Sequence, residues 1–169
     1  DELDILIGGK YLLLEFSFHS VPNNLERIIY EITRQGITPI IAHPERIKPW
    51  QREPKRLEEL INMGCPTQLD IGSFMGTMGP SSEKLAKFLF DKDAVHLVGS
   101  DSHNLQSRAL YTKPGYDWLS ERYGVEYADL LLKGNPGKIL RGEHIEVYPV
   151  HLEPDALSLK DKFINMFKS

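Results

Sequence analysis

Several carboxylate and imidazole side chains in this sequence directly follow short apolar stretches. Residues 95–99 are nearly all apolar and are followed closely by Asp101 and His103. Side chains two residues apart in an extended segment point the same way, so Asp101 and His103 can converge on one point. A carboxylate oxygen beside an imidazole nitrogen suits Mn, Fe or Zn. Taken alone, the pattern also describes a strand end whose aspartate caps the next helix.

Three other stretches share this pattern, each with an acidic residue or a histidine at its end: residues 10–15 with Glu15, residues 37–42 with His43, and residues 67–71 with Asp70. Positions 15, 43, 70 and 101 are 28, 27 and 31 residues apart, about the length of a strand followed by a helix. The carboxyl ends of parallel strands lie on one face of a sheet or barrel. The sequence therefore predicts an α/β fold with parallel strands alternating with helices, and a metal site at this face.

The remaining pattern predicts the other elements. Helical spacing predicts helices within residues 23–36, 54–63, 81–92, 116–123, 127–132 and 136–140, and a short terminal helix over 157–167. Loops are expected over 47–54, 72–80 and 105–115, a break at 134–136, and an edge strand over 145–148.

Composition narrows the class of protein. The 169 residues fit one soluble domain, with 41% hydrophobic and 26% charged residues. The net charge of −4 gives no sign of a nucleic-acid surface, and no apolar run approaches a membrane span. The single cysteine, Cys65, excludes an internal disulfide framework and fits a reducing compartment, so we expect a cytoplasmic protein.

Three segments carry a resemblance to a known family: residues 11–16, residues 40–46 with Ala-His-Pro-Glu-Arg, and residues 99–104 with Ser-Asp-Ser-His-Asn. They resemble the metal-binding segments of the PHP (polymerase and histidinol phosphatase) superfamily. More closely, they resemble its manganese-dependent bacterial protein-tyrosine phosphatases, which regulate capsule and exopolysaccharide export. The similarity runs from about residue 10 to about residue 143.

The resemblance implies a distorted (β/α)7 TIM-like barrel with a divalent metal cluster at its strand ends. Manganese is the expected metal, with Fe or Zn as alternatives. The implied metal ligands are Glu15, His43, Asp101 and His103, and the implied catalytic and phosphate-binding residues are Arg46 and Arg108. The reaction would be phosphomonoester hydrolysis, with a tyrosine-phosphorylated protein as substrate, in particular a bacterial tyrosine autokinase. Cys65 lacks an arginine six positions later, so the Cys-x5-Arg phosphatase loop is absent.

The family opens with a His-x-His strand that this sequence does not contain. We therefore expect residues 1–143 to form the C-terminal part of such a barrel, with residues 144–169 as an appendage. A barrel without its first strands exposes a sheet edge, which invites pairing with another copy or with the N-terminal segment.

Other residues near these segments have plainer interpretations. We expect Glu45 to be solvated, Asp70 to cap a helix or support the site, His19 to lie at the surface, and His96 to be a satisfied core residue. Two other functions remain open. One is a different hydrolase on this scaffold, such as a histidinol-phosphatase-like or amidohydrolase-like enzyme, and the other is a non-catalytic binding or assembly module.

Overall fold

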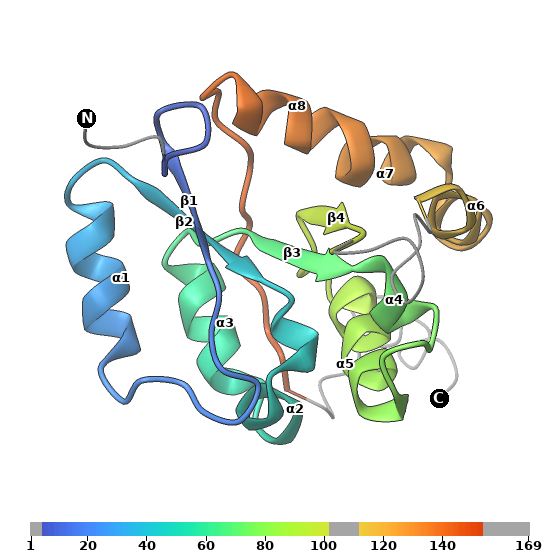
Figure 1. The fold of residues 1–169 in the computed structure, drawn as a ribbon, viewed down its shortest axis with the longest axis horizontal. Helices are drawn as coiled ribbons and strands as arrows, with labels where there is room; N and C mark the ends of the chain where they lie inside the picture. Colours follow the sequence, from blue (N-terminus) through green and yellow to red (C-terminus); the bar gives the residue numbers. More distant parts are fainter. Residues whose placement is uncertain (1–4, 102–111, 154–169) are drawn as a thin grey trace, which may run out of the picture.

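The computed structural model of the protein describes residues 5–101 and 112–153. Its sheet has four parallel strands in the order β1-β2-β3-β4, namely β1 (Tyr11–Leu14), β2 (Thr38–Ala42), β3 (Thr67–Asp70) and β4 (Leu97–Gly99). Each strand lies beside the one that precedes it in the chain, with helices between them (Figure 1). The predicted α/β class is confirmed, and the sequential strand order is that of a (β/α) barrel.

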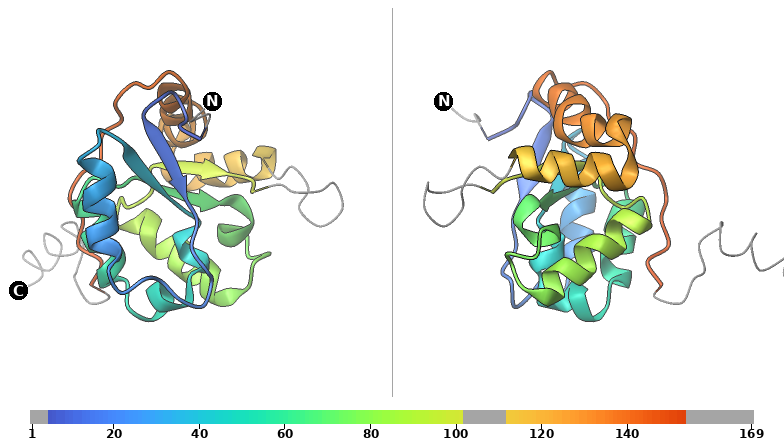
Figure 2. Two further views of the ribbon diagram at one scale, coloured as in Figure 1. Left: turned by 60° about the vertical axis from the view of Figure 1, so that its left-hand side comes forward. Right: turned by 90° about the vertical axis from the view of Figure 1, so that its right-hand side faces the viewer.

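Helices form most of the rest of the described chain. They are α1 (Leu25–Thr33), the 3₁₀ turn η1 (Pro44–Arg46), α2 (Lys48–Arg52), α3 (Lys55–Asn62), α4 (Ile71–Phe74), α5 (Pro80–Asp91), α6 (Thr112–Tyr123), α7 (Val125–Asp129), the π-helical turn η2 (Leu130–Gly134) and α8 (Asn135–Leu140). Helices α6 to α8 lie together on one side of the molecule, away from α1 and α3 (Figure 2). None of the helices within 5–101 and 112–153 is long and apolar enough to cross a bilayer.

Side chains on the two faces of the sheet belong to different apolar clusters, because successive side chains of a strand point to opposite sides. Ile41 of β2 belongs to the large core, which includes the inward faces of α1, α3 and α5. Its neighbour Ile40 lies in a smaller cluster with Tyr11 of β1, Leu97 of β4 and Ile139 of α8. The near-continuous apolar character of β2 follows from this burial on both faces.

Helix α6 packs tightly against the segment that follows β3. Aromatic rings of α4, α5 and α6 meet there, with Phe74 at 4.9 Å and Phe90 at 6.0 Å from Trp118 between ring centroids. A β-carbon added to Gly115 of α6 would lie 2.6 Å from Cγ2 of Ile71. Glycine at position 115 therefore allows α6 to approach the residue next to Asp70.

Three predicted irregular segments contain helical residues. Within 47–54, residues Lys48–Arg52 form α2 around the buried Trp50, because Pro49 stands at the start of a helix, where no N–H is needed. Within 72–80, the first residues belong to α4, which Asp70 caps. The predicted break at 134–136 is also wrong: a π-helical turn leads directly into α8, whose second residue is Pro136.

The expected loop over 105–115 is only partly tested. Thr112–Gly115 lie in α6, so that part of the prediction is wrong, and residues 105–111 lie outside the described residues. The terminal helix expected over 157–167 also lies outside them.

The segment expected to be an edge strand over 145–148 is not a strand in the structure. Residues 144–153 run without regular structure, and side chains of α3 bind the backbone of this segment. Asn62 donates to the carbonyl of Val150 at 3.2 Å and accepts its N–H at 2.9 Å, and Glu58 accepts the N–H of Leu152 at 2.6 Å. These side chains take the place of a neighbouring strand.

Candidate functional site

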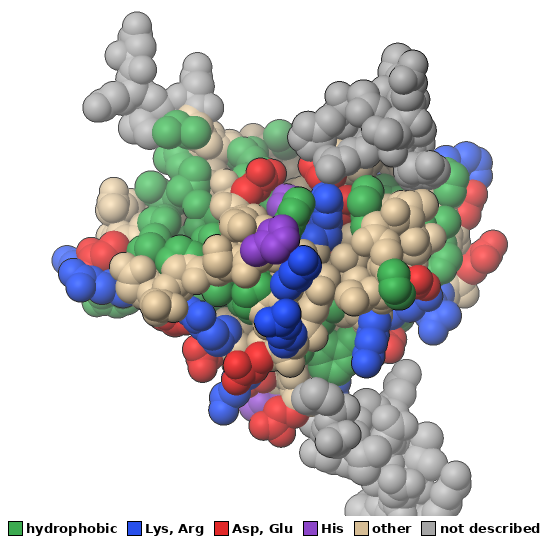
Figure 3. All heavy atoms as spheres, turned by 60° about the horizontal axis from the view of Figure 1, so that its bottom comes forward, with side chains coloured by type: hydrophobic (Ala, Val, Ile, Leu, Met, Phe, Trp, Pro, Cys, Tyr) green, Lys and Arg blue, Asp and Glu red, His purple; other side chains and the backbone are tan. Residues whose placement is uncertain are grey.

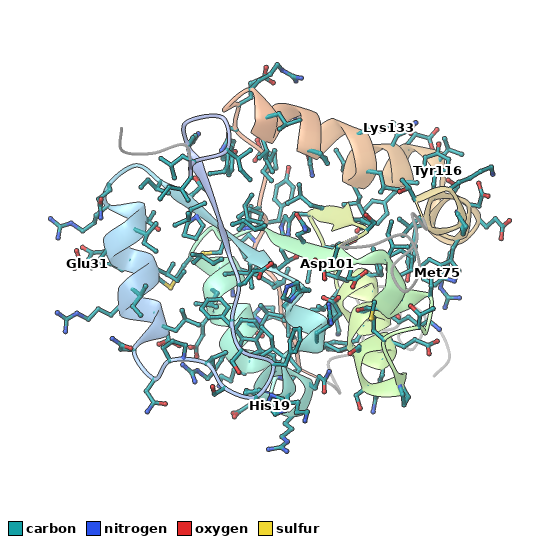
Figure 4. All side chains as sticks on the ribbon, in the orientation of Figure 1. His19, Glu31, Met75, Asp101, Tyr116 and Lys133 are labelled. Carbon is teal, nitrogen blue, oxygen red and sulfur yellow. The ribbon has the colours of Figure 1, made fainter. Side chains whose placement is uncertain are left out.

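The carboxyl ends of the four strands bring the predicted residues to one face of the sheet. Glu15 follows β1, His43 follows β2, Asp70 ends β3, and Asp101 lies two residues after β4. Figure 4 shows Asp101 near the sheet and the exposed His19 at the periphery, where a surface histidine was expected. His103 and Arg108 lie outside the described residues.

Glu15 and His43 face each other across the first two strand ends. Oε1 of Glu15 is 3.5 Å from Nε2 of His43. The histidine side chain is 8% exposed and the glutamate side chain 62%. The other ring nitrogen of His43, Nδ1, is buried and has no hydrogen-bond partner among the described residues. An imidazole nitrogen and a carboxylate oxygen at this spacing are a donor pair that suits Mn²⁺, Fe²⁺ or Zn²⁺.

Arg46 occupies the other half of the site. Its Nη1 donates to Oδ2 of Asp101 at 2.9 Å and lies 3.4 Å from Oδ2 of Asp70. The guanidinium lies 4.5 Å above the ring centroid of Phe18, whose ring also meets His43 edge to face at 5.6 Å. The Arg46 side chain is only 12% exposed, so these contacts fix its orientation. Sequence reasoning did not identify Phe18.

Two of the predicted ligands have unusual backbones. His43 has φ 33° and Asp101 has φ 43°, in the left-handed region that residues other than glycine rarely adopt. Each such residue costs on the order of 1–3 kcal/mol and persists only when its surroundings hold it. At position 43 this backbone leads from β2 into the 3₁₀ turn that carries Glu45 and Arg46.

Glu45 is buried, so the expectation that it is solvated is wrong. Its Oε1 accepts the backbone N–H of Asp70 at 3.0 Å, which joins the turn after β2 to the end of β3. Burial raises the pKa of Glu45 to about 7, against the lowering effect of the hydrogen bond from the Asp70 backbone. The turn η1 directs this side chain inward, and the residue types alone gave no signal of that direction.

Asp70 performs the capping role expected of it. Its Oδ1 accepts the N–H of Gly72 at 2.8 Å at the start of α4, while Oδ2 faces Arg46. His96 is likewise the satisfied core residue predicted: it is buried, and its Nδ1 accepts the N–H of Thr67 at 3.1 Å.

The described residues do not bring all the predicted ligands to one point. Glu15 pairs with His43, whereas Asp101 is bound to Arg46. In the described part of the chain, no group of three or more His, Cys, Asp or Glu side chains is arranged to hold a metal ion. The geometry thus provides a metal-type donor pair beside a fixed arginine.

Comparison with known proteins gives a consistent family. Residues 2–141 match the model of the capsular polysaccharide synthesis family CpsB/CapC. The chain is 37% identical over 149 residues to the tyrosine-protein phosphatase CpsB of Streptococcus pneumoniae, covering 85% of this chain and 61% of the relative. It is 32% identical over 136 residues to the tyrosine-protein phosphatase YwqE of Bacillus subtilis, covering 80% and 53%.

The fold agrees with these relatives. A solved structure from work on YwqE of Bacillus subtilis and CpsB of Streptococcus pneumoniae, described as unique metal-dependent tyrosine phosphatases, superposes with a TM-score of 0.78 at 31% identity. The match covers 83% of this chain and 57% of the solved one. The chain spans about three fifths or less of the length of these relatives.

Proposed function

The chain belongs to the CpsB/CapC family, and on this premise we propose that it carries the phosphate-binding strand ends and part of the metal site of a metal-dependent protein-tyrosine phosphatase. The observation that carries the proposal is the buried His43 Nε2 facing Glu15 Oε1 at 3.5 Å, beside the fixed guanidinium of Arg46. The relatives CpsB and YwqE are tyrosine-protein phosphatases, which supports a tyrosine-phosphorylated protein as the substrate.

The proposed roles follow from the chemistry of each group. Glu15, His43, Asp101 and His103 would hold divalent metal, Mn²⁺ in the first place, and the metal would supply Lewis-acid activation of the phosphate ester and of water. Arg46 would bind the phosphoryl oxygens, a task for which a planar guanidinium is suited. Arg108 would be the second phosphate-binding arginine.

Phe18 supports a preference for an aryl phosphate. Its ring contacts both Arg46 and His43 and remains partly exposed, so it forms an apolar wall next to the proposed phosphate position. A tyrosine ring that enters with its phosphate toward Arg46 would pack against this wall. The substrate would then be a tyrosine-phosphorylated protein in the cytoplasm, such as a tyrosine autokinase of the polysaccharide export system.

The division of the chain is part of the same proposal. Residues 1–143 would form the barrel portion and residues 144–169 the appendage, which agrees with a family match that ends at residue 141. Strand β1 stands at the edge of the described sheet, and Leu13 within it is partly exposed. This edge is where another copy of the chain or the N-terminal segment of the family would pair.

Metal content and phosphatase activity of the purified chain test this function together. After incubation with Mn²⁺ and removal of free ions, we expect about one ion per chain or more and hydrolysis of a phosphotyrosine peptide. His43→Ala should lose both, and His19→Ala, at the exposed histidine, should keep both. A folded chain that retains no metal and hydrolyses no phosphoester would instead favour a non-catalytic module.

A further inference from the structure

A second concave surface lies between α2 and α5. It is a cleft of about 760 Å³ whose lining residues come from these two helices and the turn after α2: Lys48, Gln51, Arg52, Pro54, Ser81, Lys84, Leu85 and Phe88. The cleft is separate from the strand-end residues, none of which lines it.

The charge of the cleft is entirely positive. Lys48, Arg52 and Lys84 are exposed at its rim, and no acidic residue lines it. None of these three cations forms an ion pair with another side chain in the described ranges. Three unpaired cations around one concave surface favour a ligand with at least two negative charges.

The floor of the cleft is apolar. Leu85 is buried, and Phe88 and Pro54 are partly buried beside it. Inorganic phosphate or a short carboxylate would leave this surface uncovered, whereas an aromatic ring that carries an anionic group would cover it and still reach the rim.

A hydrogen-bonded side chain of the cleft connects it to the turn η1, which carries Arg46. Nε2 of the lining residue Gln51 donates to the carbonyl of Glu45 at 2.8 Å and to Oγ of Ser82 at 3.3 Å, so it connects η1 to α5. Lys48 follows Arg46 by two residues. Figure 3 shows Lys and Arg side chains following one another down the middle of this face, beginning beside a histidine.

We propose that this cleft binds a second phosphotyrosine of the same substrate chain while another phosphotyrosine occupies the strand-end site. The inference rests on the proposed function for the identity of the substrate. The ring of the second residue would cover Leu85 and Phe88, and its phosphate would lie among Lys48, Arg52 and Lys84. Such a site would give the protein a preference for multiply phosphorylated tyrosine-rich segments, since binding at one site raises the effective concentration at the other.

Peptide binding tests the cleft independently of catalysis. Fluorescence anisotropy would compare a peptide carrying two phosphotyrosines with a peptide carrying one, using the chain in EDTA so that hydrolysis does not occur. The test variant Lys48→Gln/Arg52→Gln/Lys84→Gln removes the three rim charges from exposed positions. The control Arg27→Gln/Lys113→Gln/Lys138→Gln removes the same charge elsewhere.

We expect the doubly phosphorylated peptide to bind at least tenfold more tightly than the singly phosphorylated one, and the test variant to lose this difference. The control should keep it within about twofold. Equal binding of the two peptides to the unaltered chain would overturn the proposal. So would equally tight binding when glutamate replaces the second phosphotyrosine, since the site would then be a general acidic-peptide site.

A separate arm distinguishes failure of the cleft from failure of the proposed function. Hydrolysis of p-nitrophenyl phosphate by the Mn²⁺-loaded chain does not require the cleft, so the test variant should hydrolyse it at the unaltered rate. If the unaltered chain hydrolyses this compound but shows no preference for two phosphotyrosines, the cleft proposal fails and the phosphatase proposal stands. If it does not hydrolyse it, the phosphatase proposal fails, and the anisotropy result still decides whether the cleft binds phosphotyrosine.

Discussion

The guanidinium of Arg46, in the turn after β2, reaches across the end of β3 to bind Asp101 after β4 at 2.9 Å. On the way it faces Asp70 at 3.4 Å. One side chain therefore joins the ends of three adjacent strands, and its position is fixed by two carboxylates and the ring of Phe18. This fixed orientation supports the proposal that Arg46 binds a phosphoryl group, because little reorganisation would be needed on binding.

Arg46→Lys should separate phosphate binding from metal binding. Lysine keeps the positive charge but presents one ammonium group, which cannot contact both carboxylates and a phosphoryl group with the same planar geometry. We expect kcat/KM for a phosphotyrosine peptide to fall about 100-fold or more, with bound Mn²⁺ unchanged. Arg34→Lys, at an exposed residue directly after α1, is the matched control and should have no effect. Loss of metal together with activity would contradict this assignment.

Glu45 should contribute to stability through its contact with β3. Glu45→Ala removes the acceptor of the buried Asp70 N–H and leaves a cavity, so we expect the free energy of unfolding to fall by at least about 1–3 kcal/mol. Glu45→Gln keeps an oxygen acceptor on a side chain of the same shape, so it should lower the free energy of unfolding much less. Urea unfolding of the two variants at one pH measures the difference. Equal losses would mean that the hydrogen bond to Asp70 is not what position 45 contributes.

The sequence was sufficient for the parts of the fold and site that depend on periodicity. The apolar runs located all four strands, and their spacing predicted that Glu15, His43, Asp70 and Asp101 would share one face. The inward turn of Glu45 and the contact between Phe18 and Arg46 depend on the left-handed backbone of His43 and on side-chain packing. Neither leaves a periodic signal.

The same limit applies to the irregular segments. Pro49 predicts a loop, yet it stands near the start of α2, and the run over 134–136 predicts a break, yet the π-helical turn η2 continues directly into α8 with Pro136 near its start. Proline lacks an N–H in both settings, so residue type alone does not distinguish them. The segment over 145–148 has the composition of a strand, but the polar groups that bind the chain after it belong to helix α3 rather than to another strand.

His96 should give the protein an acid-sensitive step in stability. Burial lowers the pKa of His96 from about 6.5 in the unfolded chain to about 4. Between these values the unfolded state binds more protons, so this contribution is complete above pH 6.5 and is lost as the pH falls toward 4. The expected loss in the free energy of unfolding is about 3 kcal/mol.

His96→Asn isolates this step. Its side-chain oxygen can replace Nδ1 as acceptor of the Thr67 N–H but does not titrate. The stability difference between the unaltered protein and the variant, measured by urea unfolding from pH 7.5 to pH 4, should therefore shift in favour of the variant as the pH falls. His19→Asn, at an exposed histidine, should show no such trend. A pH-independent difference for His96→Asn would refute the prediction.

Gly115 should be intolerant of even one added methyl group. A β-carbon there would meet Cγ2 of Ile71 at 2.6 Å and Cδ1 at 3.2 Å, both in the packed region beside Asp70. Alanine normally favours a helix over glycine, yet here we expect Gly115→Ala to destabilise the protein by about 1–3 kcal/mol. Combining it with Ile71→Ala in a double-mutant cycle should recover part of the loss. A stabilising Gly115→Ala would show that α6 can move away at little cost.

The contacts between helix α3 and residues 150–152 have a consequence for hydrogen exchange. Asn62 and Glu58 bind the backbone of Val150 and Leu152, so those amides are shielded by two side chains of a helix rather than by a ladder of neighbouring amides. The side chains of Ile145, Val150 and Leu152 are buried in the apolar clusters, so we expect these amides to exchange with solvent only when this segment leaves the core.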